Sequence, residues 1–592
     1  MRRRQFLWAA SSGLILSRHT VRGQTPESAA DLTRIPTSLR QPDDWTMVGR
    51  KQWTEDLQGV IYNPTWTHFA GDVLAYWPHE TDDRQYQDFA FLHKYWLAEL
   101  DLSVKVKLFN QGTTNSIAFR AQDSRRFYEL AMRSLYEKGV YELTLWVEEA
   151  SGFRRRLAYG LAGTMEILTA AGQHPKWDTV RISARGPQME AWLNQERVIS
   201  VEDDTYAAGV IGLSSLGRVQ YSDLHVCGRQ AVPDRPWQVI PGEAPPYVYP
   251  YKSDTADLHK PTPTRMSWPT GAVLSNGEIL LMREIIPWGI YGAGKSTKLV
   301  RSQDHGRTWN GETRFEGLAL SLPFEHRDGR LSALSVMTFD EEGNIINKFT
   351  PEMYLAIDQG KLKTRRETMR VYSTDRGQTW GEPQPFLIEG KPLSAYGNFW
   401  VFSGFRRLSD GALLWTPYFG KTENTRAEER TNQTFALRSE DDGQTWSVPV
   451  PVETTRKDTN EGSAAELANG DLLIFMRSVR AAHLWKARSK DKGRTWLPLE
   501  KTEITLDCPQ FLRTRDGILV LQTRDGAVQY SPDDGTAWSP VWNIGRFIHM
   551  GCLLETGDGA LLVAHLDAGF ADITKVRASR FRVSAKSLLP AD

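Results

Sequence analysis

The sequence predicts an all-β protein, in which a six-bladed β-propeller follows a β-sandwich. Two repeated patterns predict the propeller: one short phrase occurs five times in the C-terminal half, and a glycine-centred turn occurs six times. Repetition of one supersecondary unit along the chain is typical of a repeat architecture. A third observation, strand-like patterning over residues 56–230, predicts the sandwich.

The five-fold phrase has the pattern Ser-x-Asp-x-Gly-x-Thr-Trp. An Asp that accepts backbone N–H groups, a Gly with positive φ and a Trp at the join to the next unit suit the tip of a β-hairpin. Successive copies begin 71, 66, 50 and 42 residues apart, which suits a blade of four short strands. The copies occupy residues 302–309, 373–380, 439–446, 489–496 and 531–538, and the last has Ala537 in place of Thr.

The second repeat is an Asn-Gly or Asp-Gly pair followed by aliphatic residues. It gives six hairpins if Glu342-Gly343 serves the second unit, so the last blade is expected to lack the phrase. If this turn joins strands one and two and the phrase joins strands three and four, both lie on one face of the disc. The far ends of the hairpins lie ~23 Å away, and a functional site is expected there. The other pairs are Asn276-Gly277, Asp410-Gly411, Asn469-Gly470, Asp516-Gly517 and Asp558-Gly559.

The chain of 592 residues is too long for one hydrophobic core and divides into segments of different composition. Residues 1–23 resemble a twin-arginine export signal, because Arg3 and Arg4 precede an apolar run that is too short to span a bilayer. An ordinary signal peptide is the alternative. Either signal predicts a bacterial protein exported to the periplasm or beyond. Residues 231–264 contain eight prolines and are expected to form a stiff linker to the propeller at 265–592.

The first domain, residues 56–230, is similar to concanavalin-like jelly-roll modules, including laminin-G and 3-keto-glycoside hydrolase-like ones. The resemblance lies in strand cores and turns, which specify a fold better than a function. It implies a carbohydrate-binding or spacer role rather than a second active site. The resembling segments are 117–122, 177–182, 192–194 and 219–224.

Composition excludes several classes of partner. Lys plus Arg and Asp plus Glu both number 72, which does not favour a nucleic-acid partner. No segment is long and apolar enough for a membrane span. The cysteines, Cys227, Cys508 and Cys552, show neither metal-ligand spacing nor a disulfide framework, and no phosphate-binding glycine motif occurs. We therefore expect neither a metal nor another cofactor, and the sequence does not indicate the oligomeric state.

Charged residues recur at the hairpin ends opposite the glycine turns. Arg477 and Arg524 lie seven residues after a turn glycine, and Glu461 lies nine residues before one. A guanidinium group does not lose its proton, so in a channel it needs a carboxylate partner or an anionic ligand. Two interpretations follow: Glu461 pairs with Arg477 only to stabilise the hairpin, or the residues form a binding site. Glu284 and Tyr418 occupy the same register in other units.

The five phrases and the segment from Asn460 to Arg477 resemble the sialidase (neuraminidase) superfamily, over roughly residues 262–592. The resemblance implies a glycan substrate whose sugar carboxylate is bound by three arginines, here Arg265, Arg477 and Arg524, through charge-assisted hydrogen bonds. It also implies that Glu461 is the base that activates a tyrosine nucleophile, which is the known exception to the two-carboxylate scheme.

Two positions depart from the family pattern. Met550 stands in the register of the tyrosine and has no hydroxyl, and the loop at 283–294 lacks the expected acid/base Asp. One function that remains is an exported sialidase-like glycoside hydrolase acting on an acidic terminal sugar, with Glu461 as base or nucleophile, Glu284 as substitute acid and Tyr418 reaching the site. A second is a non-catalytic carbohydrate-binding protein. A third is action on another class of sugar, with the charged cluster purely structural.

Overall fold

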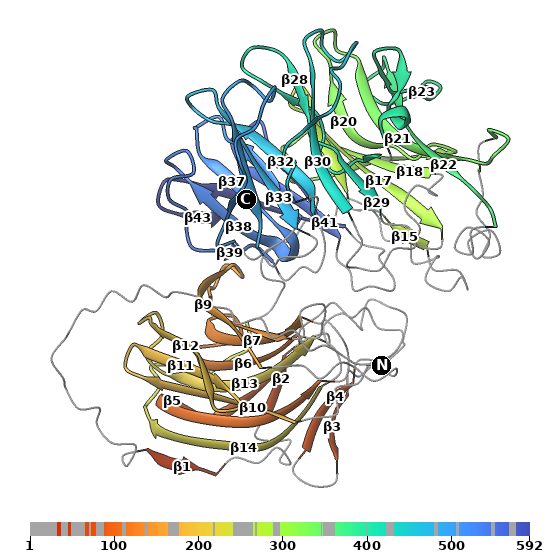
Figure 1. Cartoon of the computed structure of the whole chain (residues 1–592). Coiled ribbons are helices and arrows are strands. Elements are labelled where there is room, and N and C mark those ends of the chain that lie inside the picture. Colours follow the sequence, from red (N-terminus) through yellow and green to blue (C-terminus); the bar gives the residue numbers. More distant parts are fainter. Residues whose placement is uncertain are drawn as a thin grey trace, which may run out of the picture.

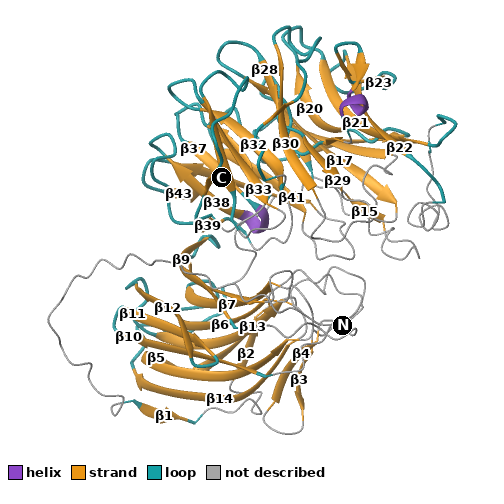
Figure 2. Ribbon diagram, viewed as in Figure 1, coloured by secondary structure: helices purple, strands orange, loops and turns teal. Residues whose placement is uncertain are grey.

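The computed structural model confirms the all-β class. Apart from two short 3-10 turns, the regular structure of the described residues consists of strands (Figure 2). The export signal at 1–23 and residues 241–263 of the linker predicted at 231–264 lie outside the described residues. Those described are 32–36, 45–48, 65–69, 73–77, 88–108, 114–135, 140–163, 177–216, 219–240, 264–266, 269–287, 296–344, 346, 361–397, 399–421, 431–456, 458–478, 483–504, 508–545, 551–566 and 576–591.

The N-terminal part forms a β domain with fourteen described strands (Figure 1). They are β1 (Thr33–Ile35), β2 (Trp45–Val48), β3 (Thr65–Phe69), β4 (Val73–Trp77), β5 (Asp88–Leu108), β6 (Thr114–Ala121), β7 (Phe127–Leu135), β8 (Val140–Glu148), β9 (Arg154–Ala162), β10 (Asp178–Arg185), β11 (Gln188–Leu193), β12 (Glu196–Glu202), β13 (Gly209–Leu216) and β14 (Val219–Gln230).

The long strand β5 takes part in two layers of this domain. Its first half pairs with β2 and β13, and the first layer continues through β6, β7, β8 and β9. Its second half pairs with β10 and β14, and the second layer continues through β11 and β12. One buried cluster contains side chains of both layers, such as Leu130 and Val180, so the layers share a core. The jelly-roll type and the domain boundaries stay predictions.

The described residues of the C-terminal part form six successive groups of antiparallel strands, numbered here 1 to 6. Groups 1 and 2 are β15 (Thr264–Met266), β16 (Thr270–Val273), β17 (Ile279–Pro287), β18 (Ser296–Ser302) and β19 (Asn310–Glu316), then β20 (Ser321–Glu325), β21 (Leu331–Phe339), β22 (Arg365–Ser373) and β23 (Gln384–Pro385). Between groups 2 and 3 lie β24 (Leu387–Ile388), β25 (Lys391–Pro392) and η6 (Leu393–Tyr396). Group 3 is β26 (Phe399–Trp400), β27 (Arg406–Arg407), β28 (Leu413–Trp415), β29 (Tyr418–Lys421), β30 (Thr431–Ser439) and β31 (Val450–Pro451).

Groups 4 to 6 each contain four strands. They are β32 (Thr459–Glu466), β33 (Leu472–Ser478), β34 (Trp485–Ser489) and β35 (Glu500–Lys501); β36 (Gln510–Arg513), β37 (Leu519–Gln522), β38 (Ala527–Ser531) and β39 (Trp542–Asn543); and β40 (Gly551–Glu555), β41 (Leu561–Leu566), β42 (Val576–Val583) and β43 (Leu588–Pro590). A 3-10 turn, η8 (Arg524–Gly526), separates β37 from β38.

Buried hydrophobic clusters join each group to its neighbour and close a ring, which is a propeller-like arrangement. The last cluster returns from group 6 to group 1, where Leu562 and Ile279 belong to the same core. Because β36–β39 is also continuous with the N-terminal domain, five groups form sheets confined to the propeller, and the expected six blades depend on counting group 5 as a blade. The other joins contain Leu280 with Ala333, Leu334 with Trp415, Leu414 with Ile474, Phe475 with Phe511, and Val520 with Val563.

The recurring phrase, here called the Asp box, forms the same hydrogen-bonded turn in five groups. In the first copy Asp304 Oδ1 accepts from the Ser302 hydroxyl at 2.8 Å and from the Thr308 amide at 2.8 Å, while Ser302 Oγ accepts from the Gly306 amide. The residue before each glycine also has positive φ, from 55° to 64°, so two successive residues are left-handed. Equivalent bonds are centred on Asp375, Asp441, Asp491 and Asp533.

The Asp-box tryptophans lie at a different join from the one expected. We expected each Trp at the join to the next unit, but each packs at the join with the preceding group. Trp309 of group 1 contacts the core that contains Leu562 of group 6, and Trp538 of group 5 packs on Phe475 of group 4. The boxes follow β18, β22, β30, β34 and β38, and the box glycine approaches the preceding group, as shown by Gly306 beside Leu562.

The glycine turn of group 2 was also wrongly assigned. The turn between β20 and β21 is Asp328-Gly329, in which the Gly329 amide donates to the His326 carbonyl, as in the other groups. Glu342-Gly343 instead follows β21, at the other end of that hairpin. Asp328-Gly329 is followed by Arg330 rather than by an aliphatic residue, so it does not match the pattern of a glycine pair followed by aliphatic residues.

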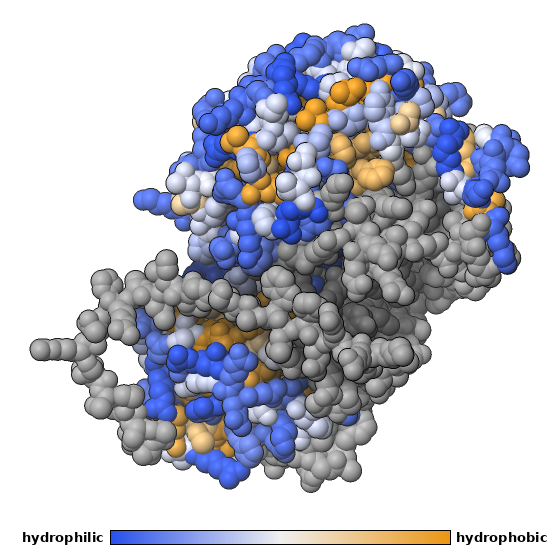
Figure 3. Space-filling view, in the orientation of Figure 1, coloured by the Kyte–Doolittle hydropathy of each residue, from blue (hydrophilic) through white to orange (hydrophobic). Residues whose placement is uncertain are grey.

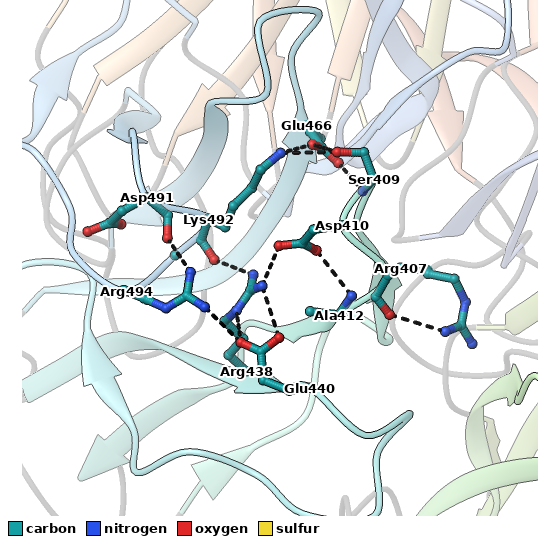
Figure 4. A network of polar contacts seen from close by, with 12 residues as sticks. Arg407, Ser409, Asp410, Ala412, Arg438, Glu440, Glu466, Asp491, Lys492 and Arg494 are labelled. Carbon is teal, nitrogen blue, oxygen red and sulfur yellow. Dashed lines mark hydrogen bonds and ion pairs between the residues drawn. The ribbon is translucent and has the colours of Figure 1, made fainter.

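Glycine turns and Asp boxes meet on one face, as the predicted connectivity requires (Figure 4). In group 4, Lys492 pairs with Glu466, while its carbonyl accepts from Arg438 Nη1 of group 3 at 2.8 Å. Arg438 also pairs with Asp410 in the turn of its own group. Hydrophilic residues coat the end of the propeller near β28 in Figure 3. These contacts hold successive groups together, so this face is scaffold.

The N-terminal domain joins the propeller through a continuous sheet. Its strand β9 pairs with β39 of group 5, and the Arg156 amide donates to the Val541 carbonyl at 2.8 Å (Figure 1). Phe153, beside β9, is buried in the hydrophobic cluster between groups 5 and 6. Backbone hydrogen bonds and a buried aromatic ring therefore fix this contact.

Acid is expected to weaken the Asp boxes. Burial raises the pKa of Asp304, but hydrogen bonds from Thr308 and Ser302 outweigh it and lower the pKa to about 2. A depressed carboxyl pKa stabilises the fold above the unfolded value of about 3.9, and this stabilisation is lost as the pH falls toward 2. Asp304→Asn should therefore lower the melting temperature at pH 7, and the gap from wild type should shrink between pH 4 and pH 2.

Thermal melts at pH 7, 4 and 2.5 test this expectation, with Asp234→Asn in the exposed segment after β14 as control. A gap of constant size across the pH range would contradict it.

Candidate functional site

The far end of the group 4 hairpin carries a partly buried ion pair. Arg477 Nη1 lies 3.3 Å from both carboxylate oxygens of Glu461, and their side chains are 24% and 9% exposed. Both residues lie at the opposite end of β32 and β33 from the turn at Gly470. The pair is therefore on the face opposite the Asp boxes, and Arg477 keeps part of its surface open to a ligand.

A β-bulge aims the Glu461 side chain. The register of β32 and β33 shifts between Asn460 and Ser463, and Glu461 has a φ of 50°, which non-glycine residues rarely adopt. The next residue, Gly462, is packed so tightly that a Cβ there would lie 2.7 Å from Thr434 Cγ2. Strain at a bulge is tolerated where the surroundings enforce it, and it is frequent at functional sites.

The group 5 hairpin repeats this arrangement with a thiol. Cys508 and Arg524 are separated by sixteen residues, as are Glu461 and Arg477, and Arg524 Nη2 lies 3.5 Å from Cys508 Sγ. Cys508 also has a positive φ, 54°. It is buried in a cluster with Phe402 of group 3, and Tyr418 of the same group packs against this cluster.

Direct hydrogen bonds connect the inner strands of groups 3, 4 and 5. Thr416 Oγ1 donates to the Gly462 carbonyl at 3.1 Å, and the Phe511 amide donates to Ser463 Oγ at 3.0 Å. The Glu461 bulge therefore lies between the segment that carries Tyr418 and the segment that follows Cys508. Tyr418 itself stacks on Trp400 with ring centres 6.4 Å apart. The Glu461–Arg477 pair, the Cys508–Arg524 pair and Tyr418 therefore belong to three adjacent groups.

The remaining candidates lie in group 1 or outside the described residues. Glu284 is half-buried near the end of β17, with its backbone opposite Thr297 of β18. The backbone of Arg265 pairs with Ile286 of β17, which places β15 at the same end of the sheet. Their relation to the Glu461 pair stays a prediction. Met550 lies outside the described residues.

Cys508, Phe402 and Trp400 were not proposed as members of the site. Cys508 and Phe402 do lie in the register nine residues before a turn glycine. The signal that identifies Cys508 is its sixteen-residue spacing from Arg524, because the same spacing separates Glu461 from Arg477. Trp400 lies directly opposite Tyr418 in the pairing of β26 with β29. Both strands are short, and no pattern in the sequence indicates this register.

A serine, a histidine and an aspartate also meet at the Asp-box face. His326 Nε2 lies 2.9 Å from Ser332 Oγ, and its Nδ1 lies 2.8 Å from the Asp442 carbonyl and 3.6 Å from the carboxylate. Burial lowers the pKa of His326, and Ser332 is only 1% exposed. A nucleophile needs access to its substrate, so we interpret this trio as a structural link between groups 2 and 3.

The described residues offer no evidence for a metal site or a membrane span. Among them, no group of three His, Cys, Asp or Glu side chains is arranged to hold a metal ion. No helix within those ranges has the length and apolar character needed to cross a bilayer.

Comparison with known proteins places the repeat region in a family context. Residues 350–546 match the BNR repeat-like domain. A sialidase from Bacteroides fragilis (strain YCH46) is 25% identical over 200 residues, covering 28% of this chain and 36% of that protein. A sialidase from Paraclostridium sordellii is 24% identical over 213 residues, covering 35% and 48%. The chain thus spans less than half the length of either relative.

Among solved structures, a mutant of the NanB sialidase from Streptococcus pneumoniae aligns with 81% of this chain and 94% of that chain, at 14% identity and a TM-score of 0.42. The matched domain and the two curated sialidases confirm the resemblance to the BNR-repeat propellers of the sialidase superfamily.

The bulge makes Gly462 sensitive to substitution. In Gly462→Ala the new Cβ would meet Thr434 Cγ2 at 2.7 Å and Ile474 Cδ1 at 3.0 Å, so the bulge must move. We expect a loss of about 1–3 kcal/mol in the free energy of unfolding, measured by urea denaturation. Gly381→Ala is the matched control, because its Cβ would meet its nearest atom at 3.5 Å. Equal stability of the two variants would show that the bulge adapts freely.

Proposed function

We propose that this protein is a sialidase-like glycoside hydrolase with an altered catalytic set, which acts on the acidic terminal sugar of a glycan. The comparisons support a glycoside hydrolase-like propeller. The observation that carries the finer proposal is the Glu461–Arg477 pair, held on a strained bulge at the face opposite the scaffold turns. Beside it, Arg524 provides a second guanidinium group on the next hairpin.

The chemistry of these groups suits an acidic sugar. Arg477 and Arg524 bind the sugar carboxylate through charge-assisted hydrogen bonds, because guanidinium groups stay charged and donate in pairs. Glu461 acts as base or nucleophile at the anomeric centre, and Glu284 is the substitute acid. Tyr418, adjacent to Cys508, contacts the bound sugar. Arg265 completes the arginine set by analogy with the family. These roles are proposals.

A second candidate function is carbohydrate binding without turnover. The stacked Trp400–Tyr418 pair favours it, since aromatic faces bind the apolar faces of sugar rings. Cys508 also favours binding without turnover, because its thiol occupies the position at which the neighbouring hairpin carries the Glu461 carboxylate. Met550 in the register of the family tyrosine adds to this case.

Export is a separate proposal. It rests on Arg3 and Arg4 ahead of an apolar run. Cell fractionation of wild type and an Arg3→Lys, Arg4→Lys variant tests it, and an unchanged distribution would contradict the twin-arginine route.

The arginines should determine affinity for an acidic sugar. Arg477→Ala and Arg524→Ala should each weaken binding of free sialic acid by about 1.5–3 kcal/mol, because each removes hydrogen bonds to a charged group. Isothermal titration calorimetry measures the change, with Arg314→Ala on the outer strand β19 as control. If both site variants melt at lower temperature but bind as wild type does, the arginines are structural.

Glu461 separates an enzyme from a binding module. Glu461→Gln keeps the size of the side chain but removes its ability to accept a proton, so release of sugars from a mixed glycan preparation should stop. Chromatography of the released sugars, with folding checked by circular dichroism, is the measurement. Identical release by the variant would exclude Glu461 from catalysis, and no release by wild type would favour the binding function.

A further inference from the structure

The turn that carries Arg524 is attached to the strand on which the N-terminal domain docks. The Thr523 amide donates to the Ala527 carbonyl at 2.9 Å, which closes η8. The Ile544 amide, just after β39, donates to the Gly526 carbonyl at 2.9 Å. Ala527 pairs with Asn543 of β39. In Figure 2 this helical turn lies beside β39, at the end of the propeller nearest β9.

Side chains of the N-terminal domain pack directly on the exit of this turn. Trp146 and Ala131 form a buried cluster with Ala527 and Val541. Ala527 is three residues after Arg524. The cluster therefore contains the first strand residue after η8 and the residue just before β39, so it contacts both segments to which the turn is hydrogen-bonded.

Charged groups fix the position of the Trp146 ring. The Arg154 guanidinium lies 4.5 Å from the ring centre, a cation–π contact. Arg154 is itself held by Glu129 at 2.9 Å and Glu148 at 3.5 Å. Because Glu129 is fully buried, this ion-pair network is rigid relative to the sandwich core. Because Trp146 packs in one cluster with Ala527, it restricts the movement of Ala527 relative to the N-terminal domain.

We propose that the N-terminal domain positions the Arg524 guanidinium, and that Trp146 is the positioning residue. The inference rests on the proposed function in taking Arg524 as a ligand-binding group. It gives the domain a role in ligand affinity that does not require the domain to touch a sugar. If η8 is loosened, the Arg524 guanidinium occupies several positions in the absence of ligand. Binding must then order this group, and the conformational entropy that is lost lowers the affinity.

The experiment uses the full chain with Trp146→Ala, and Trp192→Ala as matched control. Trp192 also has an arginine over its ring at 4.5 Å, but it lies on β11, away from the propeller contact. Hydrogen exchange of the peptide covering residues 519–528 needs no ligand. Trp146→Ala should speed exchange of the Thr523 amide tenfold or more, whereas Trp192→Ala should leave it unchanged.

Affinity for free sialic acid gives the second readout. Trp146→Ala should weaken binding five- to tenfold when Arg524 is present and should have no effect in an Arg524→Ala background. If Trp146→Ala does not yield folded protein, Val541→Ala removes part of the same cluster from the propeller side. Unchanged exchange in the 519–528 peptide would overturn the inference, as would an affinity loss that persists without Arg524. If wild type does not bind the sugar, the proposed function fails, and exchange alone decides the positioning role.

Discussion

The Asp-box turn is the interaction on which the propeller depends. Each box aspartate satisfies amide and hydroxyl groups inside its own turn, so two successive left-handed residues become tolerable. The first of these residues then faces the preceding group: Lys492 Nζ donates to Ser409 Oγ of group 3 at 3.1 Å, and Asp442 lies beside His326 of group 2. The box tryptophans pack at the same joins, so one local motif determines how successive strand groups are spaced around the ring.

Stability is thus concentrated at one face, and strain is retained at the other. Glu461 and Cys508 occupy equivalent bulged positions with positive φ, each next to an arginine sixteen residues later. The same backbone conformation thus places the Glu461 carboxylate on one hairpin and the Cys508 thiol on the next.

Local repeats made most of the fold predictable, whereas contacts between distant segments were not. The box sequence determines its own hydrogen bonds, so strand grouping, the face of the turns and the lack of a box in group 6 followed from spacing. The direction in which Trp309 packs depends on a neighbour 253 residues away, Leu562, and no local pattern encodes it. Asp328-Gly329 did not match the turn pattern, because Arg330 follows the glycine where the other turns have an aliphatic or acidic residue before the strand. For the site, the register of Glu461 and Arg477 was predictable from the spacing to the turn glycine, but the environment of Cys508 depends on tertiary packing around it.

The continuous sheet from β9 to β39 has a consequence for the independence of the two halves. A strand that ends a sheet presents unpaired amide and carbonyl groups, which invite pairing with another chain. Here β9 and β39 pair with each other, so neither strand has an open edge on that side. Phe153 is buried in the cluster between groups 5 and 6, whose apolar surface would otherwise face water. Separation of the two parts would leave both strand edges unpaired and the Phe153 ring without its hydrophobic cluster, so neither part is expected to fold as well without the other.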